Sequence, residues 1–396
     1  MPSIYFTPDD MCTTQKLEVK RINDYFIANK WSVVTDPEAA DIVFCLTCSG
    51  WEKLETISLD RLRALQYLGN KVVSVGCVND VNPRAVAEIH HGRCISMQRL
   101  KDIEDLIPDH EVRLSDIPEP STFRCKEDYR LYDLTKRFVN IASGCSFSCS
   151  YCPHKIGLGP LRSRTVEDIT AQVEDLVAEN VRIVVLTGME TAFYGRDIGT
   201  NYPYLLRKVM EVDPGFEIHV AQFNPAGVLK YCDELLPLFS STRVTDIQIP
   251  LQTTSSRILR LMNRPLKVDK VNRFLKEIRK NNKKAVFRTD IIVGFPTETI
   301  EELNETLRFV TDVYDEVAVY AFELRKGLPV ERLTDYVLPE AEMDARVEYA
   351  VEFVERSGRM AHGGQQSDVS LVEVEERKEI VRKKRQSIVN SEKGSR

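Results

Sequence analysis

Residues 138–153 read Phe-Val-Asn-Ile-Ala-Ser-Gly-Cys-Ser-Phe-Ser-Cys-Ser-Tyr-Cys-Pro and contain the most informative motif of the chain. The apolar alternation over residues 138–142 predicts a β-strand, which ends at a glycine that lets the backbone turn. The loop that follows carries Cys145, Cys149 and Cys152 in a C-x3-C-x2-C spacing. Cysteines this close together indicate disulfide, metal or cluster chemistry.

The number of cysteines in this loop restricts its chemistry. Three thiols cannot all pair with one another, and a local disulfide would leave one reactive thiol. A structural zinc site usually takes four ligands, and no fourth cysteine or histidine pair follows nearby. An iron–sulfur cube held by three thiolates keeps one iron open for a further ligand. The triplet therefore favours a catalytic iron–sulfur cluster over a zinc-binding or redox-sensitive loop.

The composition is that of an ordinary globular protein. Of its 396 residues 43% are hydrophobic and 29% charged, which is enough to build two or three domains. The sequence has no apolar run long enough to cross a bilayer and no signal peptide at its start, so we expect a cytoplasmic protein without a membrane partner. Its ten cysteines should then be mostly reduced. The formal net charge of −6 predicts no general attraction to nucleic acids.

The N-terminal part alternates strands and helices, which predicts a small parallel α/β sheet domain. Strands are expected at residues 3–6, 32–35, 42–46 and 71–75, and helices at residues 15–30 and 51–68. Cys12, Cys48 and Cys77 each follow a strand, and ligands collect at the carboxyl ends of parallel strands. The alternative for each is a small buried packing residue. The remaining cysteines show no ligand pattern and are interpreted as packing residues: Cys45, Cys94, Cys125 and Cys232.

From residue 138 onward strands again alternate with helices, as a parallel barrel requires. Strands are expected at residues 138–142, 182–187, 217–222, 246–251, 285–293 and 317–322, with a closing helix at residues 340–358. The predicted fold class is α/β, with the small parallel sheet domain followed by a partial (β/α)6 barrel. Six strands leave such a barrel open on one side, which suits a macromolecular substrate.

Four segments follow from these patterns. They are an N-terminal domain at residues 1–107, a charged and proline-dotted linker at 108–136, the barrel at 137–365, and a charged tail at 366–396. The basic run of the tail, residues 377–385, is interpreted as a solvated helix face, with RNA binding as the less favoured alternative.

The cysteine loop resembles the cluster loop of the radical SAM superfamily, in which an aromatic residue precedes the third cysteine. Tyr151 occupies this place. The resemblance implies that Cys145, Cys149 and Cys152 hold a 4Fe-4S cluster whose open iron binds S-adenosylmethionine (SAM). An electron from the cluster would cleave SAM to methionine and a 5′-deoxyadenosyl radical.

Residues 40–49 and 73–77 resemble the N-terminal domain of the methylthiotransferases, which are radical SAM enzymes with a second iron–sulfur cluster. This resemblance implies that Cys12, Cys48 and Cys77 bind a second 4Fe-4S cluster. It covers about residues 3–360 and does not include the C-terminal RNA-binding β-barrel of the tRNA-modifying members.

The same resemblance suggests residues that contact SAM. Glu190 lies where the superfamily carries a Gly-Gly-Glu segment, and a carboxylate suits the ammonium group of SAM. Gln252 lies in a segment similar to the family's Pro-Val-Gln-Ser-Gly-Ser, and Arg288 begins the segment that ends in Gly-Phe-Pro. With Tyr151, these are the expected cofactor-binding residues, and no general acid or base is predicted.

The sequence therefore predicts a radical SAM methylthiotransferase that inserts a methylthio group into an unactivated C–H bond. The family modifies a tRNA adenosine, a ribosomal-protein side chain or a ribosomally made peptide. The negative net charge favours a peptide or protein side chain, including a leader-bearing precursor peptide, with tRNA as the alternative. A reductase or flavodoxin-type protein is expected as electron donor. An iron–sulfur protein without SAM chemistry is the alternative from another class, and it would leave SAM uncleaved.

Overall fold

The computed structural model describes residues 1–8, 10–123 and 136–363, which form two compact units. Of the described residues, the first unit holds 1–8, 10–123, 138–148 and 152–163, and the second holds 136–137, 149–151 and 164–363. Part of the predicted linker and the whole predicted tail, with its basic run, lie outside the described residues. Within those residues, none of the helices has the length and apolar character needed to span a membrane.

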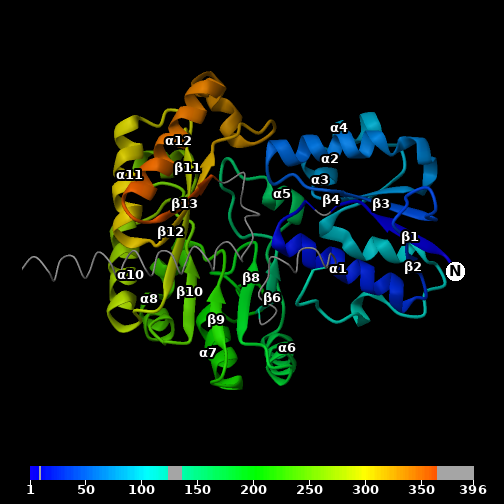
Figure 1. The fold of residues 1–396 in the computed structure, drawn as a ribbon, viewed down its shortest axis with the longest axis horizontal. Helices are drawn as coiled ribbons and strands as arrows, with labels where there is room; N and C mark the ends of the chain where they lie inside the picture. Colours follow the sequence, from blue (N-terminus) through cyan, green and yellow to red (C-terminus); the bar gives the residue numbers. More distant parts are fainter. Residues whose placement is uncertain (9, 124–135, 364–396) are drawn as a thin grey trace, which may run out of the picture. The chain divides into compact units, whose positions relative to one another are not determined.

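The first unit is built on a five-stranded parallel sheet with the order β2-β1-β3-β4-β5 (Figure 1). Its strands and α-helices are β1 (Ser3–Phe6), α1 (Thr13–Ala28), β2 (Ser32–Val33), β3 (Ile42–Thr47), α2 (Glu52–Ala64), β4 (Val72–Gly76), α3 (Val78–Val81), α4 (Pro83–Ile89) and β5 (Arg93–Ile95). The same unit contains short 3-10 helices: η1 (Gln66–Lys71) lies between α2 and β4, and η2 (Met97–Leu106) and η3 (Leu114–Asp116) come after β5. Strands β3 and β4 are continuous apolar runs because helices cover a parallel sheet on both faces. The sheet confirms the predicted N-terminal fold.

The core of the first unit explains one of the cysteines. Cys45 in β3 is fully buried in an apolar cluster that includes Val43, Leu62 and Val72. Full burial of such apolar side chains contributes roughly 1.5–3 kcal/mol each. Cys45 is therefore a packing residue, as predicted. Cys94 is exposed at β5, Cys232 is half-buried in a helix of the second unit, and Cys125 lies outside the described residues.

The first unit also contains most of β6 (Lys136–Ser143), together with α5 (His154–Leu158) and β7 (Arg162–Ser163). Strands β6 and β7 pair antiparallel, with Ala142 opposite Ser163. The turn after β6 depends on Gly144, which has φ +73°. A Cβ atom at this position would lie 2.0 Å from the carbonyl oxygen of Pro160, so no other residue fits.

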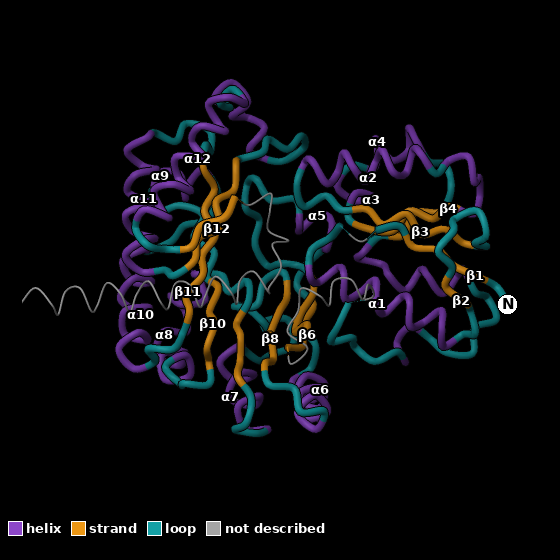
Figure 2. The backbone as a smooth tube through the Cα atoms, in the orientation of Figure 1, coloured by secondary structure: helices purple, strands orange, loops and turns teal. Residues whose placement is uncertain are grey.

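The second unit contains a parallel sheet in which the strands follow the order β13-β12-β11-β10-β9-β8. Its elements are α6 (Val166–Ala178), β8 (Ile183–Gly188), α7 (Tyr202–Val212), β9 (Glu217–Val220), α8 (Pro225–Phe239), β10 (Val244–Gln248), α9 (Ser256–Leu261), α10 (Val268–Asn281), β11 (Val286–Val293), α11 (Ile300–Val313), β12 (Glu316–Ala321), η5 (Pro329–Tyr336), α12 (Glu340–Arg356) and β13 (Met360–Gly363). Figure 2 shows these strands side by side with helices around them. This α/β arrangement confirms the predicted fold class.

Local sequence explains why these helices form where they do. Helix α11 begins with a capping box, in which Thr299 and Glu302 satisfy each other's backbone N–H groups. Helix α10 buries Val271, Leu275 and Ile278, which share one face at helical spacing. Strands β5 and β13 are not among the predicted strands, because Arg-Cys-Ile and Met-Ala-His-Gly contain few of the β-branched and aromatic residues typical of strands.

Candidate functional site

The N-terminal triplet, which we define as Cys12, Cys48 and Cys77, lies at the carboxyl ends of adjacent strands. Cys48 directly follows β3, Cys77 directly follows β4, and Cys12 precedes α1 after the loop from β1. Strands β1, β3 and β4 are neighbours in the sheet, so their ends meet at one edge. Cys48 and Cys77 are buried there, with 3% and 5% of their surfaces exposed.

Polar groups surround the sulfurs of the N-terminal triplet. Each sulfur lies beside a polar group: Thr14 Oγ1 at 3.3 Å from Cys12, the Gly50 backbone N–H at 3.4 Å from Cys48, and the Gln15 amide, which donates to Cys77. Burial raises the pKa of the Cys77 thiol well above its ordinary value, and the nearby Cys12 and Cys48 raise it further. Thiols in such a place lose their protons only when a metal replaces them.

The central triplet, which we define as Cys145, Cys149 and Cys152, lies in the loop after β6. Cys145 and Cys152 belong to the first unit and Cys149 to the second. Each sulfur has a nitrogen beside it: the Phe147 backbone N–H at 3.4 Å from Cys145, Arg264 Nη1 at 3.8 Å from Cys149, and His154 Nδ1 at 3.1 Å from Cys152. Hydrogen bonds to cysteine sulfurs favour the thiolate form and tune bound clusters, so these residues fit an iron–sulfur cluster.

Sequence reasoning assigned no role to two of these donors. Arg264 lies 115 residues after Cys149, and no local pattern reveals such a contact. Its Nη2 also donates to the carbonyl of Pro250 at 2.8 Å, which holds the guanidinium in place. For His154, the only available signal was its position two residues after Cys152.

Glu190, two residues after β8, has the properties expected of a partner for an ammonium group. It is 3% exposed, and one carboxylate oxygen accepts from the Phe193 backbone N–H at 2.9 Å. The other oxygen, Oε2, is buried and has no hydrogen-bond partner among the described residues. Burial raises the pKa of Glu190 to about 7, although Arg264 counteracts the rise. A cationic ligand would satisfy Oε2 and keep the carboxylate charged, which fits the amino group of SAM.

Tyr151 and Gln252 lie within the second unit at different places. The Tyr151 ring meets Phe295 edge to face, with 6.4 Å between ring centroids. The backbone of Gln252 has φ +74°, and its N–H donates to the Asp290 carbonyl at 2.8 Å. The fourth strand of the barrel was predicted at residues 246–251. In the structure β10 ends earlier, at Gln248, and Gln252 pairs with β11 through an isolated bridge.

Arg288 occupies a different environment from the one predicted. Its guanidinium forms an ion pair with Asp246, with 2.6 Å between Nη2 and Oδ1. It is the third residue of β11 and so lies far from the carboxyl end, where the Gly-Phe-Pro turn begins. The ion pair therefore fixes the direction of the guanidinium, and the expected contact of Arg288 with SAM stays a prediction.

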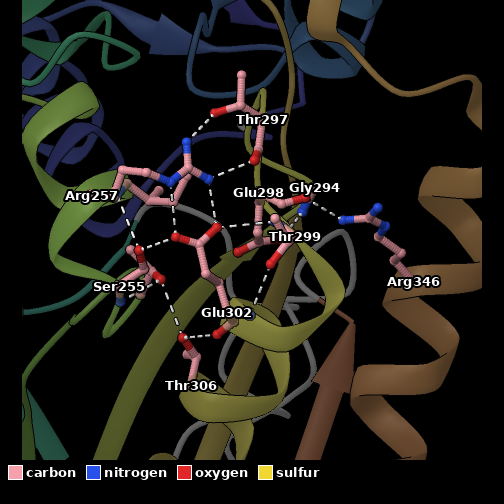
Figure 3. Close-up of polar contacts among 11 residues, drawn as sticks. Ser255, Arg257, Gly294, Thr297, Glu298, Thr299, Glu302, Thr306 and Arg346 are labelled. Atoms are coloured by element: carbon pink, nitrogen blue, oxygen red, sulfur yellow. Dashed lines mark hydrogen bonds and ion pairs between the residues drawn. The ribbon is translucent and has the colours of Figure 1, made fainter.

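A polar network stabilises the loop between β11 and α11 (Figure 3). Glu298 accepts a hydrogen bond from the Gly294 N–H at 2.8 Å, and Arg257 donates to the Thr297 carbonyl at 2.6 Å. Burial raises the pKa of Glu298 to about 7. Partial burial opposes ionisation of Glu302, but hydrogen bonds, first from Arg257, lower its pKa to about 2. This network holds the Gly-Phe-Pro turn in one conformation.

Comparisons with known proteins agree with this geometry. The family model "Radical SAM superfamily" matches residues 139–310. The chain is 30% identical to the "Probable threonylcarbamoyladenosine tRNA methylthiotransferase" of Archaeoglobus fulgidus over 82% of this chain and 77% of the relative. It is also 30% identical to the "Ribosomal protein uS12 methylthiotransferase RimO" of Thermotoga petrophila over 78% of this chain and 73% of the relative.

A solved structure supports the fold. The radical SAM methyltransferase TsrM from Kitasatospora setae superposes with a TM-score of 0.61, covering 83% of this chain and 74% of that one. The sequence identity of the pair is 13%, so the likeness concerns the fold alone.

The relatives also correct one prediction. Their names refer to tRNA and to a ribosomal protein, which overturns the predicted preference for a ribosomally made peptide. That preference relied on the net charge, which averages over the whole chain and does not report local binding surfaces. The relatives instead establish the enzyme class, and membership of the superfamily implies SAM and a 4Fe-4S cluster as cofactors. The chain therefore belongs to the radical SAM methylthiotransferases.

Proposed function

We propose that this protein is a tRNA methylthiotransferase, which inserts a methylthio group into an unactivated C–H bond of an adenosine. The observation that carries the proposal is the similarity to the Archaeoglobus fulgidus relative, which is named for threonylcarbamoyladenosine in tRNA. The similarity extends over 335 residues and so reaches beyond the superfamily match at residues 139–310. It therefore includes more of the chain than the region that all superfamily members share.

In this proposal the central triplet holds the 4Fe-4S cluster, and Glu190 binds the amino group of SAM. The nitrogen atoms beside all three sulfurs, and the buried Oε2 of Glu190, which has no hydrogen-bond partner among the described residues, support these roles. When bound, the cluster and SAM supply the radical that removes a hydrogen atom from the substrate. The task of the chain is to orient SAM and exclude water. Tyr151, Gln252 and Arg288 remain candidate SAM contacts, with the Arg288 guanidinium held by Asp246.

The N-terminal triplet is proposed to hold a second 4Fe-4S cluster, which provides the sulfur to be transferred. The position of these three cysteines at the carboxyl ends of adjacent strands supports a shared site. Because each reaction needs electrons from outside the chain, an electron donor of the reductase or flavodoxin type belongs to the proposal.

The proposal can be tested in bacterial cells whose own tRNA methylthiotransferases have been deleted. Bulk tRNA is digested to nucleosides and analysed by mass spectrometry, and uS12 from the same cells is measured intact. We expect methylthiolated threonylcarbamoyladenosine with the wild-type protein and none with Cys149→Ala. A methylthio group on uS12 with unmodified tRNA would contradict the proposal and favour the activity named for the Thermotoga relative.

A further inference from the structure

The first residue of α5, His154, places its imidazole beside a cysteine of the central triplet. Its Nδ1 lies 3.1 Å from the sulfur of Cys152. The other ring nitrogen, Nε2, lies near Gly50 in the loop that carries Cys48. A Cβ atom built on Gly50 would be 4.0 Å from this nitrogen and 3.5 Å from the sulfur of Cys48. Within the first unit, the two nitrogens of this ring therefore face different cysteine loops.

Helix α5 is held in place at several points, so the direction of the imidazole is well defined. The side-chain amide of Gln98, in η2, donates to the Ile156 carbonyl at 2.5 Å. Farther along the helix, Gly157 lies so close to Cys77 that an added Cβ atom would be 2.8 Å from the Cys77 Cβ. A donor fixed by its surroundings acts more strongly than one that must be ordered first.

The direction of the hydrogen bond follows from thiolate chemistry. A cysteine that binds a cluster iron has lost its proton, so its sulfur can only accept a hydrogen bond. The proton must then be on Nδ1 of His154, and the imidazole acts as the donor to Cys152. The other two donors to this triplet are less suitable for a test, because Phe147 uses its backbone and Arg264 also binds Pro250.

We propose that His154 is a positioning residue that donates its Nδ1–H to the Cys152 thiolate and raises the reduction potential of the bound cluster. This inference rests on the proposed function, in which the central triplet holds the 4Fe-4S cluster. Reduction adds negative charge to the cluster, and a hydrogen bond to a ligating sulfur stabilises that charge. Loss of the imidazole should make the cluster harder to reduce.

The test is a redox titration of the reconstituted full-length protein with dithionite, followed by electron paramagnetic resonance. The signal to follow is the one that changes on addition of SAM, because SAM binds only the cluster of the central triplet. With His154→Ala we expect the ratio of reduced to oxidised cluster at a fixed potential to fall roughly tenfold. For a one-electron couple this is a shift of about 59 mV.

Two further variants separate hydrogen bonding from structural damage. His154→Asn, whose amide nitrogen can take the place of Nδ1, should keep the wild-type potential. His91→Ala, which removes an exposed histidine of the same unit, should leave it unchanged. If His154→Ala binds too little iron to titrate, recovery of the iron in His154→Asn would support the donor role, and failure of both would overturn it.

A midpoint potential in His154→Ala equal to that of the wild type, at equal iron content, would overturn the inference. Failure of the proposed function would look different. In that case the wild-type protein itself would show no cluster signal that responds to SAM, whichever residue occupies position 154.

Discussion

Glu190 and Glu298 are two buried carboxyl groups of the second unit whose pKa values are raised by burial to about 7. Each accepts one hydrogen bond from a backbone N–H, and each has a second oxygen without a partner among the described residues. They differ in location. Glu298 closes the turn before α11, whereas Glu190 follows the carboxyl end of β8, where ligands collect in parallel sheets. The proposed ligand role therefore belongs to Glu190.

Glu190→Gln should weaken SAM binding. The variant keeps the size of the side chain but removes the charge opposite the ammonium group, and a hydrogen bond to a charged group contributes about 1.5–3 kcal/mol. We expect the dissociation constant to rise roughly 10- to 100-fold in anaerobic equilibrium dialysis with the reconstituted protein. Glu211→Gln, on the surface of α7, is the matched control. Unchanged affinity in Glu190→Gln would refute the assignment.

Glu298→Gln should change how stability depends on pH. The pKa of Glu298 is about 7 in the folded state, compared with 4.5 for an unperturbed glutamate, so the folded state binds the proton more tightly than the unfolded state. The resulting stability is complete below about pH 4.5 and is lost as the pH rises through 7. In urea titrations at pH 5 and pH 8, the wild type should lose roughly 1–3 kcal/mol more stability than Glu298→Gln. Parallel losses in the two proteins would contradict the prediction.

At the scale of elements, α5 connects the surroundings of the two cysteine triplets within the first unit. His154 at its start lies beside Cys152, and Gly157 near its end lies against Cys77. The helix has only five residues, so the place where the chain positions it decides whether both contacts can form. Strand β6 and the turn at Gly144 supply that position, because the chain cannot turn there with any other residue.

Gly157→Ala should disturb the N-terminal triplet selectively. The added Cβ atom would lie 2.8 Å from the Cys77 Cβ and 3.0 Å from its sulfur, so Cys77 must move. We expect about half of the bound iron to be lost, since one of two clusters is affected, while SAM cleavage continues. Gly363→Ala is the matched control, because no atom of the described residues lies within 4 Å of the Cβ atom built there. Equal iron contents in the two variants would contradict the proposed role of Cys77.

The whole molecule combines a small parallel sheet, which carries the N-terminal triplet, with the α/β fold that radical SAM enzymes share. The two triplets are proposed to serve different steps, with radical formation at the central triplet and sulfur transfer at the N-terminal one. A variant that lacks a cysteine of the central triplet should therefore lose a different activity from a variant that lacks a cysteine of the N-terminal triplet.

Cys149→Ala should abolish SAM cleavage, measured as 5′-deoxyadenosine, and with it methylthio transfer. Cys48→Ala should lose about half of the iron and all methylthio transfer but should still cleave SAM. Both variants are compared with Cys45→Ala, which alters a buried packing residue outside either triplet. If Cys48→Ala retains full iron content, the N-terminal triplet is not a cluster site, and the proposed transfer step fails.

Much of the fold and of the candidate site can be predicted because its signals are local. The cysteine spacing, the apolar strands that alternate with helices, and the turn at Gly144 all depend on neighbours along the chain. Convergence of Cys12, Cys48 and Cys77 follows from one further rule, that parallel strands share their carboxyl edge. For these features, the amino-acid sequence alone was enough to predict the local structure.

Only the tertiary structure decided the partners of the charged side chains. Arg264 reaches Cys149 across 115 residues, and Arg288 forms an ion pair with Asp246 on a neighbouring strand. Such pairs depend on strand register and helix packing, which bring together residues that share no sequence pattern. The sequence by itself determined the family and its fold class and predicted the cysteine ligands; the folded chain decided which charged side chains pair with one another, because only folding sets the distances between them.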